Sequence, residues 1–162
     1  MVKYWQTRKG RLNGNLPVID QDELSRIADN RVFVVFDTDC VLCSRWVSFL
    51  LRHERDKRMI FVSAWSSTGL TLASTHKLSR ADLHLTYLVI EKGRPLTYSA
   101  AGLALLRRLK APWRWLAALV VVPGPLRDRL YSWVARNRYA WFGRKDRCFV
   151  PPPGAQRRFV ED

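Results

Sequence analysis

A chain of 162 residues, of which 48% are hydrophobic, can bury one sizeable core, and this composition excludes a disordered protein. The formal net charge of +14 favours anionic partners without identifying one. The three cysteines, Cys40, Cys43 and Cys148, are too few and too unevenly spaced for a secreted scaffold held by disulfides.

The first thirty residues predict an irregular lead, with a short helix at 21–28. Residues 1–20 have no apolar core of their own, so we expect no signal peptide and a cytoplasmic location. The longest apolar run, 115–122, is shorter than the ~20 apolar residues that a membrane-spanning helix needs. We therefore expect residues 31–162 to form one domain.

The next segment predicts a strand, a turn and a helix. Residues 31–36 form a continuous β-branched and aromatic run, which is typical of a buried strand. Turn-forming residues occupy 37–39, and apolar residues then recur at helical spacing over 40–55, with Asp39 placed to cap the helix. The apolar face of this helix consists of Trp46, Val47, Leu50 and Leu51.

Shorter elements follow along the chain. Residues 59–64 predict a second buried strand, and 69–75 a short helix. Two further strands, at 85–90 and 94–98, are joined by a turn that contains Gly93, which predicts a hairpin. Ser99 is a suitable cap for a helix that runs through Leu109 and stops at Pro112.

This order of elements predicts an α/β fold. Strand, helix, strand, helix, strand, strand and helix make the thioredoxin-like βαβ-α-ββα layout, in which two parallel strands precede a hairpin. After Pro112, residues 113–142 predict a C-terminal helical extension of two helices, followed by a tail. In the second helix, Leu126, Leu130 and Val134 recur at i+4, and we expect them on its buried face.

Cys40 and Cys43 fall at the junction between the first strand and the first helix. A thiol attacks as its thiolate, and a helix N-terminus stabilises that anion through unpaired N–H groups and the helix dipole. The spacing of three residues puts both sulfurs on one helical face. The pattern predicts Cys40 as the attacking thiol and Cys43, one turn later, as the resolving thiol.

Two carboxylates flank this pair. Asp37 and Asp39 repel a thiolate and raise its pKa, which opposes the helix dipole. Alternatively, Asp37 accepts the proton of Cys43 and takes part in catalysis.

The stretch from Val34 to Cys43, VVFDTDCVLC, resembles the signature of the DCC family of thiol-disulfide oxidoreductases, Asp-Gly-x-Cys-x-x-Cys after a strand. Asp37, Cys40 and Cys43 match the three residues that name the family. Segment 126–143 also resembles the closing helix of that family, and the likeness extends over residues 32–159.

The resemblance implies a thioredoxin-like fold and exchange with protein or small-molecule thiols and disulfides, without an organic cofactor. Thr38 stands where the signature has glycine. Residues 83–86 lack the proline that thioredoxins carry before the third strand, so the thioredoxin docking edge does not transfer. His84 or Thr86 either faces the cysteines or has a structural role, and we favour the structural role.

Two other chemistries use residues of these types. A zinc site at Cys40 and Cys43 needs two more ligands, and no second pair occurs at ligand spacing. The run Asp37-Thr38-Asp39 also fits the first motif of haloacid-dehalogenase-type phosphatases, with Asp37 as nucleophile and Asp39 as acid or base. No later acidic cluster for Mg²⁺ follows, which disfavours that interpretation. We expect no bound metal.

An alternative to an enzyme is a basic module that binds nucleic acid or a membrane surface and has a structural cysteine pair. Most of the basic excess lies between Arg107 and Arg158, where only Asp128 and Asp146 are acidic. Tryptophans and tyrosines alternate with these arginines, as in stacking or interfacial surfaces. We favour packing of the aromatic residues against the domain, with anionic contact through this C-terminal third as the alternative. Cys148, in its basic surroundings, is either a relay thiol or a buried structural residue.

Overall fold

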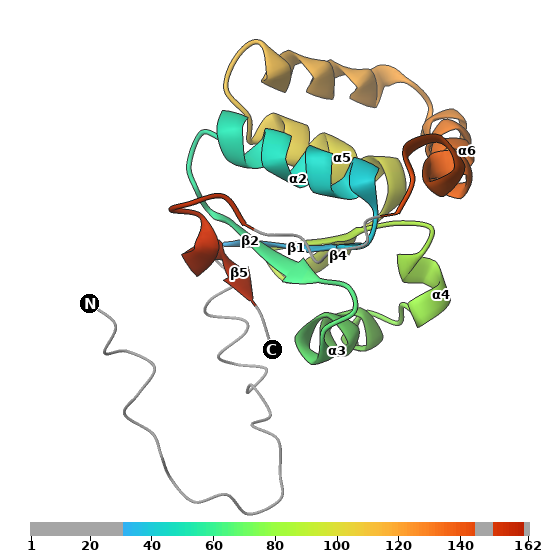
Figure 1. Ribbon diagram of the computed structural model, residues 1–162. Helices are drawn as coiled ribbons and strands as arrows, with labels where there is room; N and C mark the ends of the chain where they lie inside the picture. Colours follow the sequence, from blue (N-terminus) through green and yellow to red (C-terminus); the bar gives the residue numbers. More distant parts are fainter. Residues whose placement is uncertain (1–30, 145–150, 161–162) are drawn as a thin grey trace, which may run out of the picture.

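The computed structural model describes residues 31–144 and 151–160 (Figure 1). A five-stranded sheet in the order β4-β3-β1-β2-β5 forms the middle layer. Helices α2 and α5 cover one face of the sheet, and α3 and α4 lie on the other (Figure 1). The elements are β1 (Val32–Phe36), α2 (Val41–His53), β2 (Met59–Ser63), α3 (Ser67–Thr75), α4 (Arg80–Leu83), β3 (Leu88–Glu91), β4 (Arg94–Leu96), α5 (Tyr98–Arg107), the 3₁₀ helix η1 (Trp113–Val121), α6 (Gly124–Phe142), the 3₁₀ helix η2 (Gln156–Arg158) and β5 (Phe159–Val160).

Strand β1 is central because every one of its residues is apolar and buried. It pairs in parallel with β2, which follows α2, and antiparallel with β3, the first strand of the hairpin. This arrangement confirms the predicted α/β thioredoxin-like fold.

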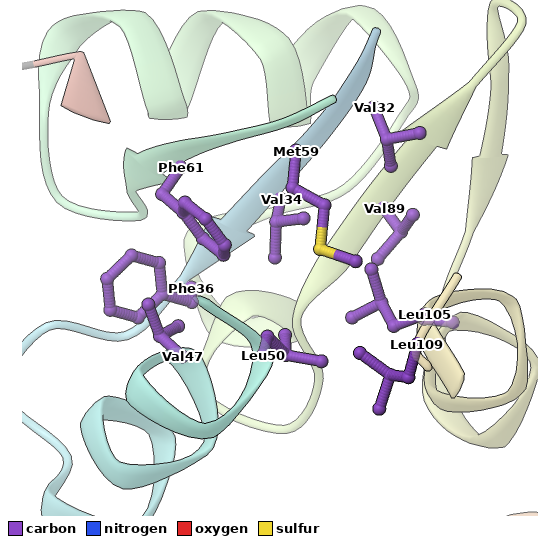
Figure 2. Close-up of a cluster of buried hydrophobic side chains, with 11 residues drawn as sticks. Val32, Val34, Phe36, Val47, Leu50, Met59, Phe61, Val89, Leu105 and Leu109 are labelled. Atoms are coloured by element: carbon purple, nitrogen blue, oxygen red, sulfur yellow. The ribbon is translucent and has the colours of Figure 1, made fainter. Parts of the chain in front are cut away.

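The sheet separates two apolar clusters. Successive residues of a strand point to opposite faces, and in β1 Val34 and Phe36 pack against α2 and α5, whereas Val35 packs toward α3 and α4. Figure 2 shows the first cluster, in which Leu50 of α2 and Leu105 of α5 converge on the strand side chains. Because this cluster fixes α2 against the end of β1, it also fixes the segment that carries the cysteines.

The boundaries of the hairpin and of α5 differ from the prediction. β3 begins only at Leu88, because Ser79 and Asp82 form a capping box that starts the short helix α4 in the preceding segment. Ser99 is wrong as a helix cap, since Thr97 is the N-cap residue of α5. The Ser99 amide and hydroxyl instead donate to Asp128 of α6.

The predicted buried face of the last helix is also wrong. Leu126 and Leu130 are 60% and 61% exposed, while Ala135 and Arg138 are buried. Val134 is half-buried. Helix α6 therefore turns a different face toward α2 and α5 from the one that the i+4 spacing of its leucines indicates.

Strand β5 adds an edge that the sequence pattern does not predict. Phe159 stacks on Phe61 of β2 with ring centroids 5.1 Å apart, and β5 pairs with β2 in parallel. Arg158 forms an ion pair with the buried Glu54 and donates through Nε to the Met59 carbonyl at 3.0 Å. These contacts join the end of the chain to the sheet.

The predicted lead at 1–30, with its short helix, lies outside the described residues, as does Cys148. Within 31–144 and 151–160, no helix has the length and apolarity to cross a membrane.

The first turn of α3 lies very close to β2. A Cβ added at Gly69 would be 2.0 Å from the Ser63 carbonyl oxygen, so Gly69→Ala is expected to lower the free energy of unfolding by about 2 kcal/mol. Gly124→Ala is the control, since the nearest atom to its Cβ would be 3.8 Å away. Urea unfolding of both variants tests this contact, and equal stabilities would contradict it.

Candidate functional site

The turn after β1 places Cys40 and Cys43 at the start of α2. The Asp39 amide donates to Asp37 Oδ1 at 3.0 Å, which closes the turn. Cys40 is the N-cap residue, and its Sγ accepts the Cys43 amide at 3.4 Å. Asp39 is therefore wrong as the predicted cap, because the Cys40 sulfur takes that position. The sulfur consequently lies at the positive end of the helix dipole.

Thr38 fits this turn without strain. The φ angle of Thr38 is not positive, so the backbone at this position does not require glycine. Its hydroxyl lies 3.1 Å from that of Ser63 at the end of β2. The departure from the family signature is thus accommodated by a contact with the neighbouring strand.

Asp37 is buried at the centre of a hydrogen-bond network. Its Oδ2 accepts from Arg138 at 2.7 Å and from the Tyr139 hydroxyl, both on α6. Its Oδ1 accepts from the Trp65 indole N–H at 3.0 Å in addition to the turn amide. Both carboxylate oxygens are therefore engaged.

The Asp37–Arg138 pair is an ion pair in the interior. The two side chains are only 1% and 4% exposed. A buried charge is tolerated when it is paired and its remaining hydrogen-bonding capacity is used. The additional donors to Asp37 meet that requirement for the carboxylate, while Nε of Arg138 has no hydrogen-bond partner among the described residues.

The surroundings move the pKa values of the two cysteines in opposite directions. The pKa of Cys40 is lowered to about 6, first by a hydrogen bond from the Cys43 thiol, then by the Cys43 amide and the Arg138 charge, while burial opposes this. The pKa of Cys43 is raised because its thiol donates that hydrogen bond and because it is buried. The negative charge of Asp37 raises both pKa values, as the sequence predicts, but it is among the smaller contributions.

A cavity of about 240 Å³ opens beside Cys43, between the sheet, α2 and α6. Its lining is largely apolar and includes Trp46, Tyr87, Tyr131 and Arg138. Burial raises the pKa of Tyr131 to about 12 and also raises that of Tyr87, so both phenols stay neutral. Arg138 is thus the charged group that lines this cavity.

The two thiols differ in exposure. Cys40 is fully buried and Cys43 is half-buried. The Arg144 backbone, just after α6, pairs with that of Cys40 in an isolated antiparallel bridge. The chain that leaves α6 therefore lies directly beside the first cysteine.

The side chains of Trp65, Arg138 and Tyr139 belong to this site but are absent from the sequence-based candidates. A signal for Arg138 exists, because it follows Tyr131 and Ala135 at helical spacing on the inner face of α6. A charged residue on an apolar helix face indicates a buried partner. No such local signal marks Trp65.

His84 and Thr86 take structural positions. Thr86 is buried, donates to the Tyr87 carbonyl and accepts the Tyr98 amide at 2.7 Å. His84 packs on Trp65, with ring centroids 4.5 Å apart. His84 therefore contacts the site indirectly, through the Trp65 indole that donates to Asp37.

The other chemistries find little support in this geometry. Among the described residues no three His, Cys, Asp or Glu side chains gather as they would around a metal ion. Asp37, the candidate phosphatase nucleophile, is buried with both oxygens accepting hydrogen bonds.

Comparison with known proteins gives a family match over the same residues. The profile of the DCC1-like thiol-disulfide oxidoreductase family matches residues 34–144. The uncharacterized protein YuxK of Bacillus subtilis is 38% identical over 131 residues, which cover 81% of this chain and 94% of that protein.

A plant protein is also similar. The DCC family protein At1g52590, chloroplastic, of Arabidopsis thaliana is 36% identical over 121 residues, which cover 74% of this chain and 70% of its own. No solved structure gives a significant match. The chain belongs to the DCC1-like family of thiol-disulfide oxidoreductases.

Proposed function

We propose that Cys40 is the attacking thiolate and Cys43 the resolving thiol of this oxidoreductase. Cys40 Sγ attacks a substrate disulfide, a Cys40–substrate disulfide forms, and the displaced substrate sulfur leaves as a thiolate that takes a proton. Cys43 then loses its proton and attacks Cys40, which releases the second substrate thiol. The substrate gains two electrons, and Cys40 and Cys43 become a disulfide.

The observation that carries this assignment is the asymmetry between the two thiols. Cys40, at the helix N-terminus, has a pKa of about 6, so it is mostly ionised at neutral pH. Cys43 has a raised pKa and stays protonated until a mixed disulfide removes the thiolate to which it donates. Cys40 is therefore a thiolate that can attack, whereas Cys43 stays a protonated thiol until the mixed disulfide has formed.

The burial of Cys40 requires a local opening before attack. Because Cys40 is 0% exposed, a substrate sulfur reaches it directly from solvent when a neighbouring segment separates. The backbone bridge to Arg144 is the contact that such an opening would break. Alternatively, substrate enters through the cavity at Cys43, whose apolar lining suits a disulfide with an apolar neighbouring group.

Asp37 is proposed to accept the proton of Cys43 in the second step. The same carboxylate also holds Arg138 in place through their ion pair. The coulombic effect of Asp37 on both thiols supports its proximity. An oxygen that gains a proton would give up one of its present donors. The pairing with Arg138 also means that the carboxylate limits how strongly the arginine stabilises the thiolate.

Thiols and disulfides are the substrate class of the family, and the direction given above, reduction of the substrate disulfide, is part of the proposal. A separate dithiol or disulfide protein would complete the cycle.

Trapping of the mixed disulfide tests the assignment of roles. With oxidised glutathione as probe, Cys43→Ser is expected to accumulate an adduct on Cys40, because no thiol remains to resolve it. Cys40→Ser is the matched control and should accumulate less adduct on Cys43, because burial still raises the pKa of that thiol after its hydrogen bond to Cys40 is lost. Peptide mapping by mass spectrometry distinguishes these sites from Cys148. Faster labelling of Cys43 in the control would reverse the roles.

The pH dependence of alkylation tests the hydrogen bond between the thiols. The rate of Cys40 alkylation by iodoacetamide should have its midpoint near 6 in the wild type. Cys43→Ala removes the side-chain donor and is expected to move the midpoint upward, toward 9. Cys43→Ser keeps a hydroxyl donor and should hold the midpoint near the wild-type value. Equal midpoints in the alanine and serine variants would show that this hydrogen bond does not set the pKa.

Asp37→Asn tests the proposed proton acceptor. Loss of a positioned base typically costs 10²-fold or more, so the release of substrate from the mixed disulfide should slow by about that factor. The attack by Cys40 should be retained, since loss of the Asp37 charge lowers the pKa of Cys40 further. Asp39→Asn, at an exposed position two residues away, is the control and should leave both steps unchanged. If rapid-quench measurements find that the rate of substrate release and its pH dependence are the same in Asp37→Asn and the wild type, Asp37 is not the proton acceptor.

A further inference from the structure

The consecutive elements η1 and α6 carry many exposed apolar side chains, and neither the cysteine site nor the core uses them. We call these residues together the aromatic-basic surface. Its apolar members are Trp115, Leu116, Leu119, Val120 and Val121 of η1, and Leu126, Leu130, Trp133 and Trp141 of α6, which are between 46% and 83% exposed. So many large apolar side chains exposed on two consecutive elements are typical of an interaction site.

The arrangement of these residues is ordered. On α6, Leu126, Leu130, Trp133 and Trp141 follow one another at helical spacing along one face, opposite the buried Ala135. Trp133 and Trp141 contact each other edge to face, with centroids 4.8 Å apart. Both η1 and α6 lie on the α2 and α5 side of the sheet, away from α3 and α4 (Figure 1).

The charge around this surface has one sign. Arg114, Arg129 and Arg136 are exposed on the same two elements. Asp128 is the acidic residue of α6, and it accepts hydrogen bonds from Ser99 instead of pairing with these arginines. A partner that covers the surface must therefore be apolar where it meets the leucines and tryptophans, and anionic around them.

We propose that the aromatic-basic surface docks this protein on an anionic lipid bilayer. Tryptophan and arginine beside exposed aliphatic side chains are typical of helices that lie in the plane of a membrane interface. Exposed leucine and valine contribute neither stacking nor phosphate contacts, so they suit acyl chains better than nucleic acid. A second copy of this chain, also charged +14, would bring arginines of like sign together.

The geometry fits attachment along the surface. Nine residues of 3₁₀ helix in η1 extend over about 18 Å, against about 30 Å for the hydrocarbon core of a bilayer. In this position η1 and α6 insert their side chains at the headgroup level, while the sheet and α3 remain in water. The inference is independent of the thiol chemistry.

Flotation with vesicles tests the apolar part of the proposal. Full-length protein is expected to float with vesicles of phosphatidylglycerol and phosphatidylcholine, and far less with phosphatidylcholine alone. The double variant Val121→Ser/Leu130→Ser should bind at least about tenfold more weakly, because two exposed aliphatic side chains no longer enter the bilayer. Leu85→Ser is the control, since Leu85 is exposed but lies outside the aromatic-basic surface, just after α4.

Charge variants test the anionic part. Arg129→Gln/Arg136→Gln should weaken binding to the anionic vesicles by about tenfold or more. Arg94→Gln/Arg157→Gln removes the same charge from exposed positions outside the surface and should bind as wild type does. These exposed substitutions should leave the far-ultraviolet circular dichroism and the glutathione adduct on Cys40 unchanged.

Four results would overturn the proposal. The first is an absence of vesicle binding at low salt, and the second is binding that the serine double variant retains in full. The third is a concentration-dependent dimer in analytical ultracentrifugation that the same serine variant abolishes, which would make the surface a self-association interface. Tight binding to duplex DNA without any to vesicles would likewise assign the surface to nucleic acid.

Discussion

The buried ion pair between Asp37 and Arg138 joins two residues that are 101 positions apart. It connects the end of the central strand to the inner face of α6, so the last long helix and the cysteine turn are positioned by one interaction. Loss of one partner from such a pair typically costs about 3–5 kcal/mol, because the other charge stays buried and uncompensated. The Tyr139 and Trp65 side chains, which also donate to the carboxylate, make the pair tolerable in the interior.

The same pair limits the electrostatic contribution to thiol reactivity. Arg138 lowers the pKa of Cys40 and Asp37 raises it, so the two charges partly cancel at the sulfur. The largest contribution is the hydrogen bond from the Cys43 thiol. Because that hydrogen bond exists only in the reduced protein, the reactivity of Cys40 depends directly on the state of its partner cysteine. The spacing that brings Cys43 within hydrogen-bonding distance of Cys40 thus lowers the Cys40 pKa more than the nearby charges do.

The elements that could be predicted from the sequence are those that local patterns determine. Local patterns are enough to predict the apolar strand β1, the amphipathic helix α2 and the glycine-containing hairpin turn. The order of β1 and α2 in turn places Cys40 at a helix start. The parts that could not be predicted depend on contacts between distant residues. Ser99 is a good cap by residue type, yet Asp128 of α6 engages it.

Helix α6 shows a different limit of sequence patterns. Apolar residues occupy more than one of its faces, so periodicity alone does not reveal which face packs. The inward face is the one that carries Arg138, because the buried Asp37 provides its counter-charge. Leu126 and Leu130 are consequently turned outward. The short strand β5 escapes prediction because two residues are too few to show a period.

The most direct test of a redox-active pair is an equilibrium titration of the full-length protein in glutathione buffers of graded potential. Free thiols are trapped by alkylation and assigned by mass spectrometry. Cys40 and Cys43 are expected to lose their labels together in a single reversible two-electron transition, as a disulfide forms between them. Thiols that remain fully labelled at every potential, or that oxidise independently of each other, would contradict it.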